Sequence, residues 1–487
     1  MTTTSRATQR SPTSGGPSRA VPRERAVPPA APALPEPASD AKSGVGTWWQ
    51  PAWARGRRAA AGLIRALPAW ARDWRFWLVF AVAAALRLAA IGRSPFDSDD
   101  ALLFLEAARA ARDHLLPGTG IYSSLLALNP PAYTFLLLPF ALHPLGMAIL
   151  TALANVAAVA GLYLFAARHL GRNAALVAGL FLATAPYDTW MSEFVWQQTI
   201  VIPLLLAALA LAYEGAVRGR RWWLVPHAAL ALLAIQIYPL AAAFLLVTLV
   251  AMLLAWRTVR LGTLALVVLV AELLFLPTVL FELASGGYDL PIYAQWLAAP
   301  KHTDLAGFTA LAQALGPQAS DFFGSNTWYS SIAPGFAWLT PVIVALWLAA
   351  TAWLALVLLV PLAIAVIQMV RGRGIARLRT VLTSRKWRAR LLLLPFPLAL
   401  LAASTRHATP VYVHYLFVLT PLIYLTIGDF LTSFPAQIAR GLRAIRLGAL
   451  VGTLADAFAS GLAGFASGAL LAAQFAVTSV LILTVAL

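Results

Sequence analysis

The chain has 487 residues, of which 60% are hydrophobic and 11% are charged, and its mean hydropathy is +0.76. A soluble protein of this apolarity would leave too much apolar surface uncovered, whereas a bilayer accepts helices of roughly 20 apolar residues. The net charge of +17 would suit nucleic-acid binding, but the placement of the charges along the chain excludes that class. The chain has no cysteine, which rules out disulfides and thiolate metal sites.

Residues 1–72 form a compositional block of their own. Proline and arginine are scattered through it and apolar residues are few before Trp48, which predicts a disordered cytoplasmic tail. No apolar run lies near Met1, so we expect no cleavable secretory signal. The stretch between Trp48 and Trp74 is rich in both tryptophan and arginine, a composition typical of an interfacial helix. Residues 73–487 are predicted to form the transmembrane domain.

Apolar runs predict an all-α, polytopic membrane protein with about eleven spans, within a range of 11–13. The predicted spans lie near residues 76–92, 146–167, 173–189, 197–214, 222–238, 240–256, 261–280, 335–370, 391–404, 412–430 and 447–470. The run 335–370 would be about 54 Å long as one helix, so part of it is expected at the interface. The C-terminal stretch 431–487 is left open, because its last 40 residues suit one span or two.

The distribution of lysine and arginine predicts the orientation. If the tail is cytoplasmic, thirty of the 36 basic residues fall on the cytoplasmic side, in agreement with the positive-inside rule. The same rule argues against splitting 335–370, because a split would place the basic segment 371–390 outside. We therefore expect a multi-pass protein of the cytoplasmic membrane with a cytoplasmic N-terminus. Most acidic loop residues then face outward, and with them most candidate catalytic groups.

The first outer loop, residues 93–144, carries a dense acidic group, Asp97, Asp99 and Asp100, directly after the first span. Residues 101–116 combine leucines with charged residues at a spacing that separates them onto two faces of a helix, which predicts a helix along the membrane surface. Pro117-Gly118 ends this helix. A turn at residues 129–131 then returns the chain to the bilayer. Residues 134–142 are too short to span alone and are predicted to be re-entrant.

Several motifs occur in an order that resembles a known family. They are Asp99-Asp100-Ala101, Asn129-Pro130-Pro131, Gly171 to Ala175 through Ala185-Pro186, Trp190 to Trp196, Ala234 to Tyr238, and His414-Tyr415. In order and spacing over roughly residues 76–430, the chain resembles the polyprenyl-phosphate-sugar-dependent glycosyltransferases of the GT-C fold. That group includes protein O-mannosyltransferases, lipid A aminoarabinose transferase and lipid A galacturonosyltransferase-like enzymes. Where the family usually has glutamate after the aspartate, this chain has Asp100.

The resemblance implies transfer of a sugar, hexosyl or pentosyl, from a polyprenyl-phosphate donor to a lipid, glycan or protein acceptor on the outer face. Such transfer needs a base for the acceptor proton and groups that stabilise the departing phosphate. We expect Asp99 to be the base of an inverting reaction, with Asp100 or Asp97 orienting the acceptor. Without the resemblance, these acids would more often be only solvated loop residues.

The few outer cations are the candidates for binding the donor phosphate. The resemblance favours Arg406 and His407, with Lys301 and His302 of the second outer loop, 281–334, as the next choice. Further candidate binding residues are His414, Tyr415, Glu193, Gln197, Gln236, Tyr238 and Asn129. Several have a plain structural alternative: Arg406 and His407 as an interfacial anchor, Glu193 and Gln197 as helix caps, and Gln236 and Tyr238 as part of the aromatic belt.

The remaining expectations concern metal, partners and other classes of function. Three acids within four positions could hold a divalent cation. The family members that take a single sugar from a monophosphate donor generally use no metal, and this chain resembles those members more. No metal or other cofactor is therefore expected. The expected partners are the lipid-linked donor and membrane lipids, with no nucleic acid and with the oligomeric state open. A transporter or flippase of lipid-linked sugars is the alternative, although transporters place polar groups at the midplane in repeated halves. Glu272, inside a predicted span, is either functional or hydrogen-bonded to a neighbouring helix.

Overall fold

The computed structural model describes residues 68, 70–92, 98–114, 116–317, 333–372, 375–444 and 449–486. The chain divides into two units, Met1–Ala66 and Leu67–Leu487, and the description below concerns the second. The predicted disordered tail and its interfacial segment lie outside the described residues, except for the few residues that precede the first helix.

Long apolar helices make up most of this unit. They are α2 (Trp74–Leu88), α5 (Pro144–His169), α6 (Arg172–Thr184), α8 (Gln197–Ala212), α9 (Leu224–Ile237), α10 (Leu245–Ala255), α11 (Leu261–Ala284), α16 (Leu339–Val370), α19 (Pro395–Ser404), α21 (Thr420–Ala444) and α22 (Ala449–Ala486). Shorter elements connect them: α3 (Ser98–Arg112), α4 (Ala132–Leu137), α7 (Pro186–Met191), α12 (Leu290–Ala298), α13 (Ala306–Leu315), α17 (Ala376–Thr383), α18 (Arg385–Leu391), α20 (Val413–Leu416), and strands β1 (His302–Thr303) and β2 (Arg406–His407).

The all-α polytopic prediction is confirmed. Each predicted span overlaps an apolar helix, and within the described ranges seven helices are long and apolar enough to cross a membrane. Residues 339–370 of the predicted span 335–370 form one continuous helix, α16, so the run is not split into two spans. The last 40 residues, which the sequence left open, form the single helix α22. The protein is therefore a multi-pass helical membrane protein.

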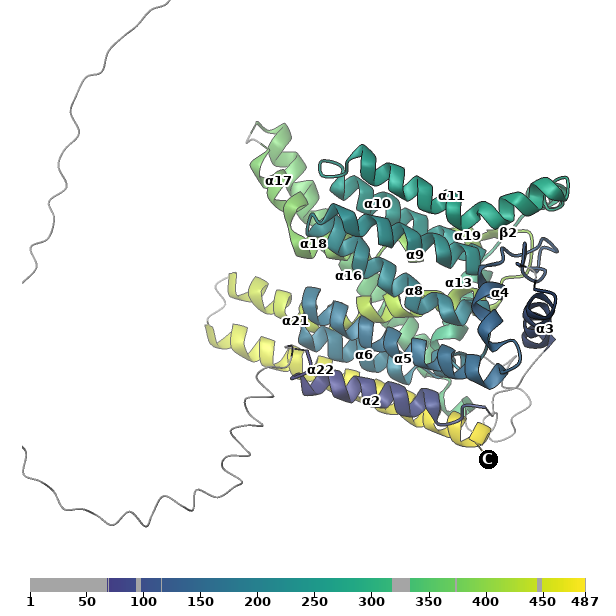
Figure 1. The fold of residues 1–487 in the computed structure, drawn as a ribbon. Helices are drawn as coiled ribbons and strands as arrows, with labels where there is room; N and C mark the ends of the chain where they lie inside the picture. The colour runs from purple at the N-terminus through teal and green to yellow at the C-terminus, as the bar shows by residue number, and fades with distance from the viewer. Residues whose placement is uncertain are drawn as a thin grey trace, which may run out of the picture. The chain divides into compact units, whose positions relative to one another are not determined.

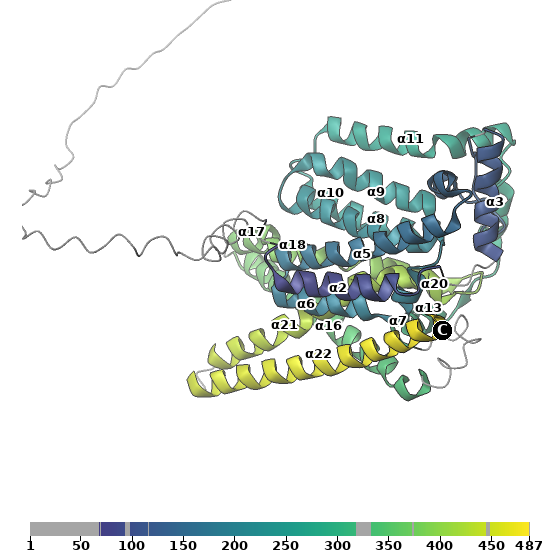
Figure 2. The ribbon, with the colours of Figure 1, turned by 60° about the horizontal axis from the view of Figure 1, so that its bottom comes forward.

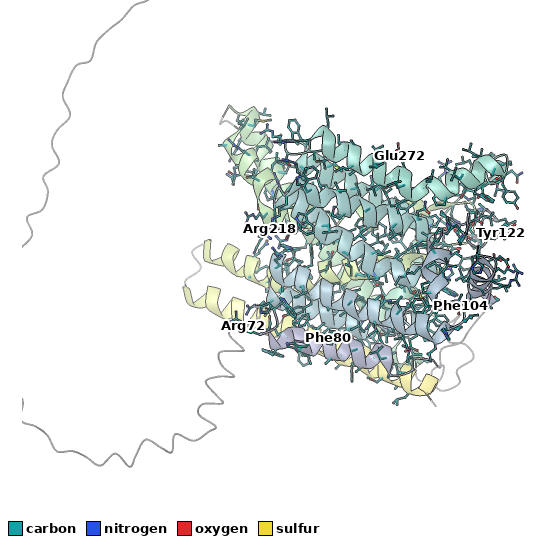
Figure 3. The ribbon with its side chains drawn as sticks, viewed as in Figure 1. Arg72, Phe80, Phe104, Tyr122, Arg218 and Glu272 are labelled. Carbon is teal, nitrogen blue, oxygen red and sulfur yellow. The ribbon has the colours of Figure 1, made fainter. Side chains whose placement is uncertain are left out.

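The helices of the bundle run side by side, and its two ends differ in character (Figure 1). Helix α3 lies at one end, and α17 and α18 lie at the other, in both ribbon views (Figures 1 and 2), and Figure 1 shows strand β2 at the α3 end. Arg72 and Arg218 lie at the α17 end, whereas Phe104 and Tyr122 lie at the α3 end (Figure 3). Loops predicted to be cytoplasmic and loops predicted to be external thus occupy opposite ends of the bundle.

Some predicted boundaries were wrong. The surface helix begins at Ser98 and ends at Arg112 instead of covering 101–116, so Asp99 and Asp100 lie inside its first turn. Negative charge is stabilised there by the helix dipole, and His114, with φ of 52°, interrupts helical geometry beyond it. The predicted span 391–404 starts too early, because α18 ends at Leu391 and α19 begins at Pro395.

The predicted span 173–189 is also interrupted. Ala185 adopts an extended conformation before Pro186, which cannot donate a hydrogen bond, so α6 stops at Thr184 and the short α7 follows. Buried Arg87 of α2 donates hydrogen bonds to the carbonyls of Leu182 (2.8 Å) and Ala183 (2.9 Å). Acceptors that the break leaves without a helical partner are satisfied in this way.

A second buried arginine lies toward the α17 end. Arg390 of α18 donates hydrogen bonds from Nε (2.7 Å) and from Nη2 (3.0 Å) to the two carboxylate oxygens of Asp429 on α21. Its guanidinium also lies 4.9 Å from the centre of the Trp353 ring on α16. This forked geometry joins three helices at one point.

Candidate functional site

The start of α3 positions Asp99 and Asp100, two of the acidic residues that were predicted to be catalytic. Helix α3 crosses the end of the bundle instead of running along it (Figure 2), and Asp99 and Asp100 occupy its first turn. Asp99 is exposed, whereas Asp100 is only 1% exposed. The two neighbouring carboxylates therefore have different access to a substrate. Asp97 lies outside the described residues.

Asp100 faces the interior of the bundle. Its charge acts on the buried phenol of Tyr133 in α4. The Tyr133 hydroxyl donates a hydrogen bond of 2.7 Å to the carbonyl of Val195, in the loop between α7 and α8. The start of α3 is thereby connected to the segment that carries Glu193 and Gln197.

Asp99 lies near the turn that precedes α21. Its charge acts on Tyr415 of α20, and the Tyr415 hydroxyl donates a hydrogen bond of 2.9 Å to Ser124. Ser124 is part of a short loop closed by backbone hydrogen bonds between Gly120 or Ile121 and Asn129. Asn129 is buried at the base of this loop, where it shapes the turn.

Aromatic rings surround His414. The ring centres of His414 and Trp196 are 5.1 Å apart, and Tyr412 stacks on His414 at 5.4 Å. Glu193 and Gln197 are buried on either side of Trp196 in the chain. The structure thus brings Asp99, His414, Tyr415 and the loop 192–197 into one region.

Gln236 and Tyr238 border the same region at the end of α9. The Tyr238 hydroxyl donates a 3.5 Å hydrogen bond to the carbonyl of Tyr415. Gln236 is 1% exposed, and within the described part of the chain neither polar atom of its amide has a hydrogen-bond partner. The Nε2 atom of Gln197 is in the same situation. Buried amides of this kind normally pair with protein, water or a ligand.

The second group of candidates lies on a two-stranded ribbon. Strands β1 and β2 pair antiparallel, with His302 opposite His407 and Thr303 opposite Arg406. In His407, Nδ1 lies 2.8 Å from the Thr409 carbonyl and Nε2 lies 3.0 Å from Asp304 Oδ1. Both partners are acceptors, so this geometry favours the form of the ring that carries a proton on both nitrogens. The hydrogen bond to Asp304 raises the pKa of His407, and the same bond lowers the pKa of Asp304.

The other two cations of this group have different environments. Lys301 Nζ lies 4.2 Å from the centre of the Trp296 ring and donates to the Trp296 carbonyl. Arg406 is exposed, and among the described residues no acidic side chain pairs with it. Consecutive strand residues point to opposite faces, so Arg406 and His407 are directed to different sides of the ribbon.

A cavity of about 660 Å³ is lined by residues that contact members of both groups. Its lining includes Tyr122, Ser124, Tyr288, Gln295, Trp296 and Thr409. Ser124 connects it to Tyr415 and Asp99, Trp296 connects it to Lys301, and Thr409 connects it to His407. The Tyr122 and Tyr288 hydroxyls are 3.2 Å apart at its wall. Phenols, an amide and hydroxyls offer donors and acceptors of the kind that sugar hydroxyls bind.

The residues of the cavity wall were not predicted from the sequence. Tyr122, Tyr288 and Trp296 come from two outer loops, and each looks like an ordinary interfacial aromatic residue when it is read alone. No role was predicted for Asp289. Its carboxylate accepts a 3.0 Å hydrogen bond from the Leu128 backbone and thereby holds the two loops together. The sequence signal that could have indicated this wall is the presence of polar residues among the aromatic ones in 281–299.

The described residues contain no group of three or more His, Cys, Asp or Glu side chains that could hold a metal ion. Asp97 is not among these residues, so the expectation of a metal-independent site stays a prediction.

The comparisons with known proteins concern structure alone. No family model matches the chain, and no curated protein sequence matches it. Among solved structures, ArnT from Cupriavidus metallidurans bound to undecaprenyl phosphate is similar with a TM-score of 0.51 and 17% identity, over 84% of this chain and 76% of that one. Its apo state gives 0.49 and 17% over 84% and 75%. The archaeal oligosaccharyltransferase AglB from Archaeoglobus fulgidus gives 0.45 and 12% over 86% and 56%.

The likeness to ArnT extends over most of both chains and agrees with the fold implied by the order of the sequence motifs. It rests on the arrangement of the helices, since the sequence identity is low. The chain therefore has the GT-C fold.

Proposed function

We propose that this protein is a membrane glycosyltransferase that takes a sugar from a polyprenyl-phosphate donor and adds it to an acceptor on the outer face of the cytoplasmic membrane. The observation that carries the proposal is the placement of Asp99, an exposed carboxylate at the start of α3, near Tyr415, whose hydroxyl donates a hydrogen bond to Ser124 of the cavity wall. The GT-C fold, and a similar structure described as bound to undecaprenyl phosphate, support the class of donor.

In the proposed reaction, the Asp99 carboxylate takes the proton of an acceptor hydroxyl. The acceptor oxygen attacks the anomeric carbon, the bond from that carbon to the phosphate oxygen breaks, and the polyprenyl phosphate leaves with the bonding electrons. One displacement inverts the anomeric centre and needs only one base. Asp99 suits this part because its carboxylate is accessible and the α3 dipole stabilises its charged form.

Asp100 has a different part in the proposal. Its burial against Tyr133 keeps it away from an acceptor, so we assign it to positioning the start of α3. Asp97 is proposed as a second orienting group for the acceptor.

The departing phosphate needs positive charge or hydrogen-bond donors. Arg406 is the first choice, because its guanidinium is exposed and has no acidic partner among the described residues. The charged ring of His407 adds positive potential, while its two nitrogens are held by Asp304 and Thr409. Lys301 and His302 are the second choice, and no metal is invoked.

The cavity is the proposed site of the transferred sugar or of the acceptor. Tyr122, Tyr288 and Gln295 line it with polar groups, and Trp296 supplies an aromatic face. The buried amides of Gln236 and Gln197 lie deeper, near Tyr415, and are proposed to bind substrate through water or directly.

The test uses the purified full chain in lipid nanodiscs with a panel of polyprenyl-phosphate sugars. Asp99→Asn is expected to lower kcat by about 10²- to 10⁴-fold with little change in donor binding, because it removes the general base. Asp113→Asn is the matched control, since Asp113 follows α3 at its opposite end and is paired with Arg112.

Full activity in Asp99→Asn would refute the assigned base. Wild-type protein that moves lipid-linked sugars across a bilayer without transferring them would favour the alternative, a transporter.

A further inference from the structure

The break between α6 and α7 is held open by side chains of two other helices. Because Pro186 has no N–H group and the residue before it is extended, the carbonyls of residues 182–184 have no partner within α6. Arg87 of α2 donates hydrogen bonds to the first two of these carbonyls. Thr478 of α22 donates a bond of 2.7 Å to the third. All three carbonyls are therefore paired, and the break is a stable part of the buried interior.

Beyond the break, α7 contacts the start of α21 through two consecutive residues. The hydroxyl of Thr420, the first residue of α21, donates a hydrogen bond to Asp188 Oδ1. Asp188 is 4% exposed and Thr420 is completely buried. The ring of Tyr187 packs edge-on against the ring of Phe417, with the ring centres 5.9 Å apart. Helix α7 thus holds the segment 417–420 by a hydrogen bond and by an aromatic contact.

This segment ends the turn that carries two candidate site residues, His414 and Tyr415. The turn consists of residues 412–420 and is called the His414 turn below. Figure 2 shows α7 and α20 at the α3 end of the bundle. The hydrogen bond that the Tyr415 hydroxyl donates to the first outer loop holds one part of this turn. The bond from Thr420 to Asp188 holds its other end, in the interior of the bundle.

We propose that Asp188 is a positioning residue for sugar transfer, because through Thr420 it holds the His414 turn in its place beside Asp99. This inference rests on the proposed function, to which it adds a residue. Asp188 is buried and is not part of the cavity lining, so it acts through the turn and not on a substrate. Reacting groups must be held in a near-attack geometry, and a displacement of about 1 Å can lower the rate about 10²-fold.

The alternative is that Asp188 only balances the charge of buried Arg87. The charge of each residue acts on the other. Their hydrogen bonds, however, have different directions: both Nη atoms of Arg87 donate to carbonyls of α6, whereas Asp188 Oδ1 accepts from Thr420. The orientation of the carboxylate is therefore coupled to the His414 turn. Charge balance alone would make the Thr420 hydroxyl dispensable for catalysis, which is what the experiments test.

The first test compares two buried threonines of α21 in the full chain in lipid nanodiscs. Thr420→Val removes the hydroxyl that binds Asp188. The matched control, Thr426→Val, removes a hydroxyl that donates within α21, to the Leu422 carbonyl at 2.8 Å. Thr420→Val is expected to lower kcat about tenfold with little change in the donor KM, and Thr426→Val to leave kcat unchanged. Both should lower the melting temperature by similar amounts, because each removes a buried hydroxyl.

Two conservative variants separate the hydrogen bond from the charge. Thr420→Ser keeps the hydroxyl and should retain the wild-type kcat. Asp188→Asn keeps an oxygen that accepts the bond from Thr420 and should retain most of kcat although the charge is lost. Equal kcat in Thr420→Val and Thr426→Val would overturn the proposal. A loss in Asp188→Asn as large as that in Thr420→Val would also overturn it.

The second test does not depend on sugar transfer. The chain has no cysteine, so Tyr412→Cys, at an exposed position of the His414 turn, accepts a single nitroxide spin label. Electron paramagnetic resonance is expected to show a more mobile label when Thr420→Val is added, and no change when Thr426→Val is added. An unchanged spectrum in Thr420→Val would overturn the positioning role of Asp188. A mobile label in a protein that transfers no sugar would refute the proposed function but confirm that Asp188 holds the turn.

Discussion

The Tyr415 hydroxyl donates a hydrogen bond of 2.9 Å to Ser124, which is 291 positions earlier in the chain. This bond joins the first outer loop to the turn before α21, and Asp99 acts on the same phenol. Tyr415→Phe is expected to lower kcat/KM about fivefold, because it removes a hydrogen bond with a net contribution of about 1 kcal/mol. Steady-state transfer assays check this.

The same assays supply a control at the other end of the bond. Ser124→Ala should produce a similar loss, and the double variant should be little worse than either single one, since both remove one interaction. Strictly additive losses would show that Tyr415 acts independently of Ser124.

The His407–Asp304 pair predicts a pH dependence. Because the pKa of His407 is raised, the charge of its ring and its ion pair with Asp304 are present below that raised pKa and are lost as pH rises through it. Because the pKa of Asp304 is lowered, the pair persists well into the acid range. We expect donor binding to weaken on the alkaline side. Asp304→Asn should move this decline to lower pH, as measured by KM against pH.

Arg406 is expected to govern donor binding. Arg406→Gln should raise the donor KM about 10- to 100-fold, since hydrogen bonds to charged groups contribute about 1.5–3 kcal/mol. Arg109→Gln is the control, because Arg109 is equally exposed at the same end of the bundle but is paired with Glu106. An unchanged KM in Arg406→Gln would transfer the assignment to Lys301 and His302.

Arg390 and Asp429 are expected to affect stability without a selective effect on catalysis. Asp429→Asn leaves the buried Arg390 guanidinium without its charged partner and should destabilise the protein by about 3 kcal/mol. Thermal unfolding in detergent measures this. The double variant Arg390→Met with Asp429→Leu should recover much of the loss, and a failure to recover would show that the fork contributes more than charge neutralisation.

Transfer is expected to be independent of added metal. Activity in excess chelator should equal activity in buffer, because the proposed reaction uses a carboxylate base and arginine. Loss of activity that manganese or magnesium restores would contradict this.

The sequence predicted the fold well because span length and charge placement follow from the bilayer itself. Apolar runs had to be helices, and basic loops had to gather at one end. The run ending at Thr184 shows where such reasoning fails. Pro186 indicates a break in the helix. The sequence alone does not show that Arg87 donates hydrogen bonds to the carbonyl groups that lose their helical partners at this break.

The candidate site was predictable in part for a related reason. Asp99, His414 and Tyr415 occur in recognisable motifs, and the structure places them in one region. The burial of Asp100 was not predictable, because it depends on the direction of α3 across the bundle end. Tyr122 and Tyr288 meet only through tertiary packing of loops 166 positions apart.

The contact between Arg87 and the end of α6 also bears on how the chain assembles. Arg87 is made 95 and 96 positions before its two acceptors. Because synthesis runs from the N-terminus, the first span is made before the third span, which carries the two carbonyl groups that accept hydrogen bonds from the Arg87 guanidinium. These two helices form a unit that no shorter nascent chain can complete, and membrane insertase contacts with α2 should persist until residue 183 has entered the bilayer.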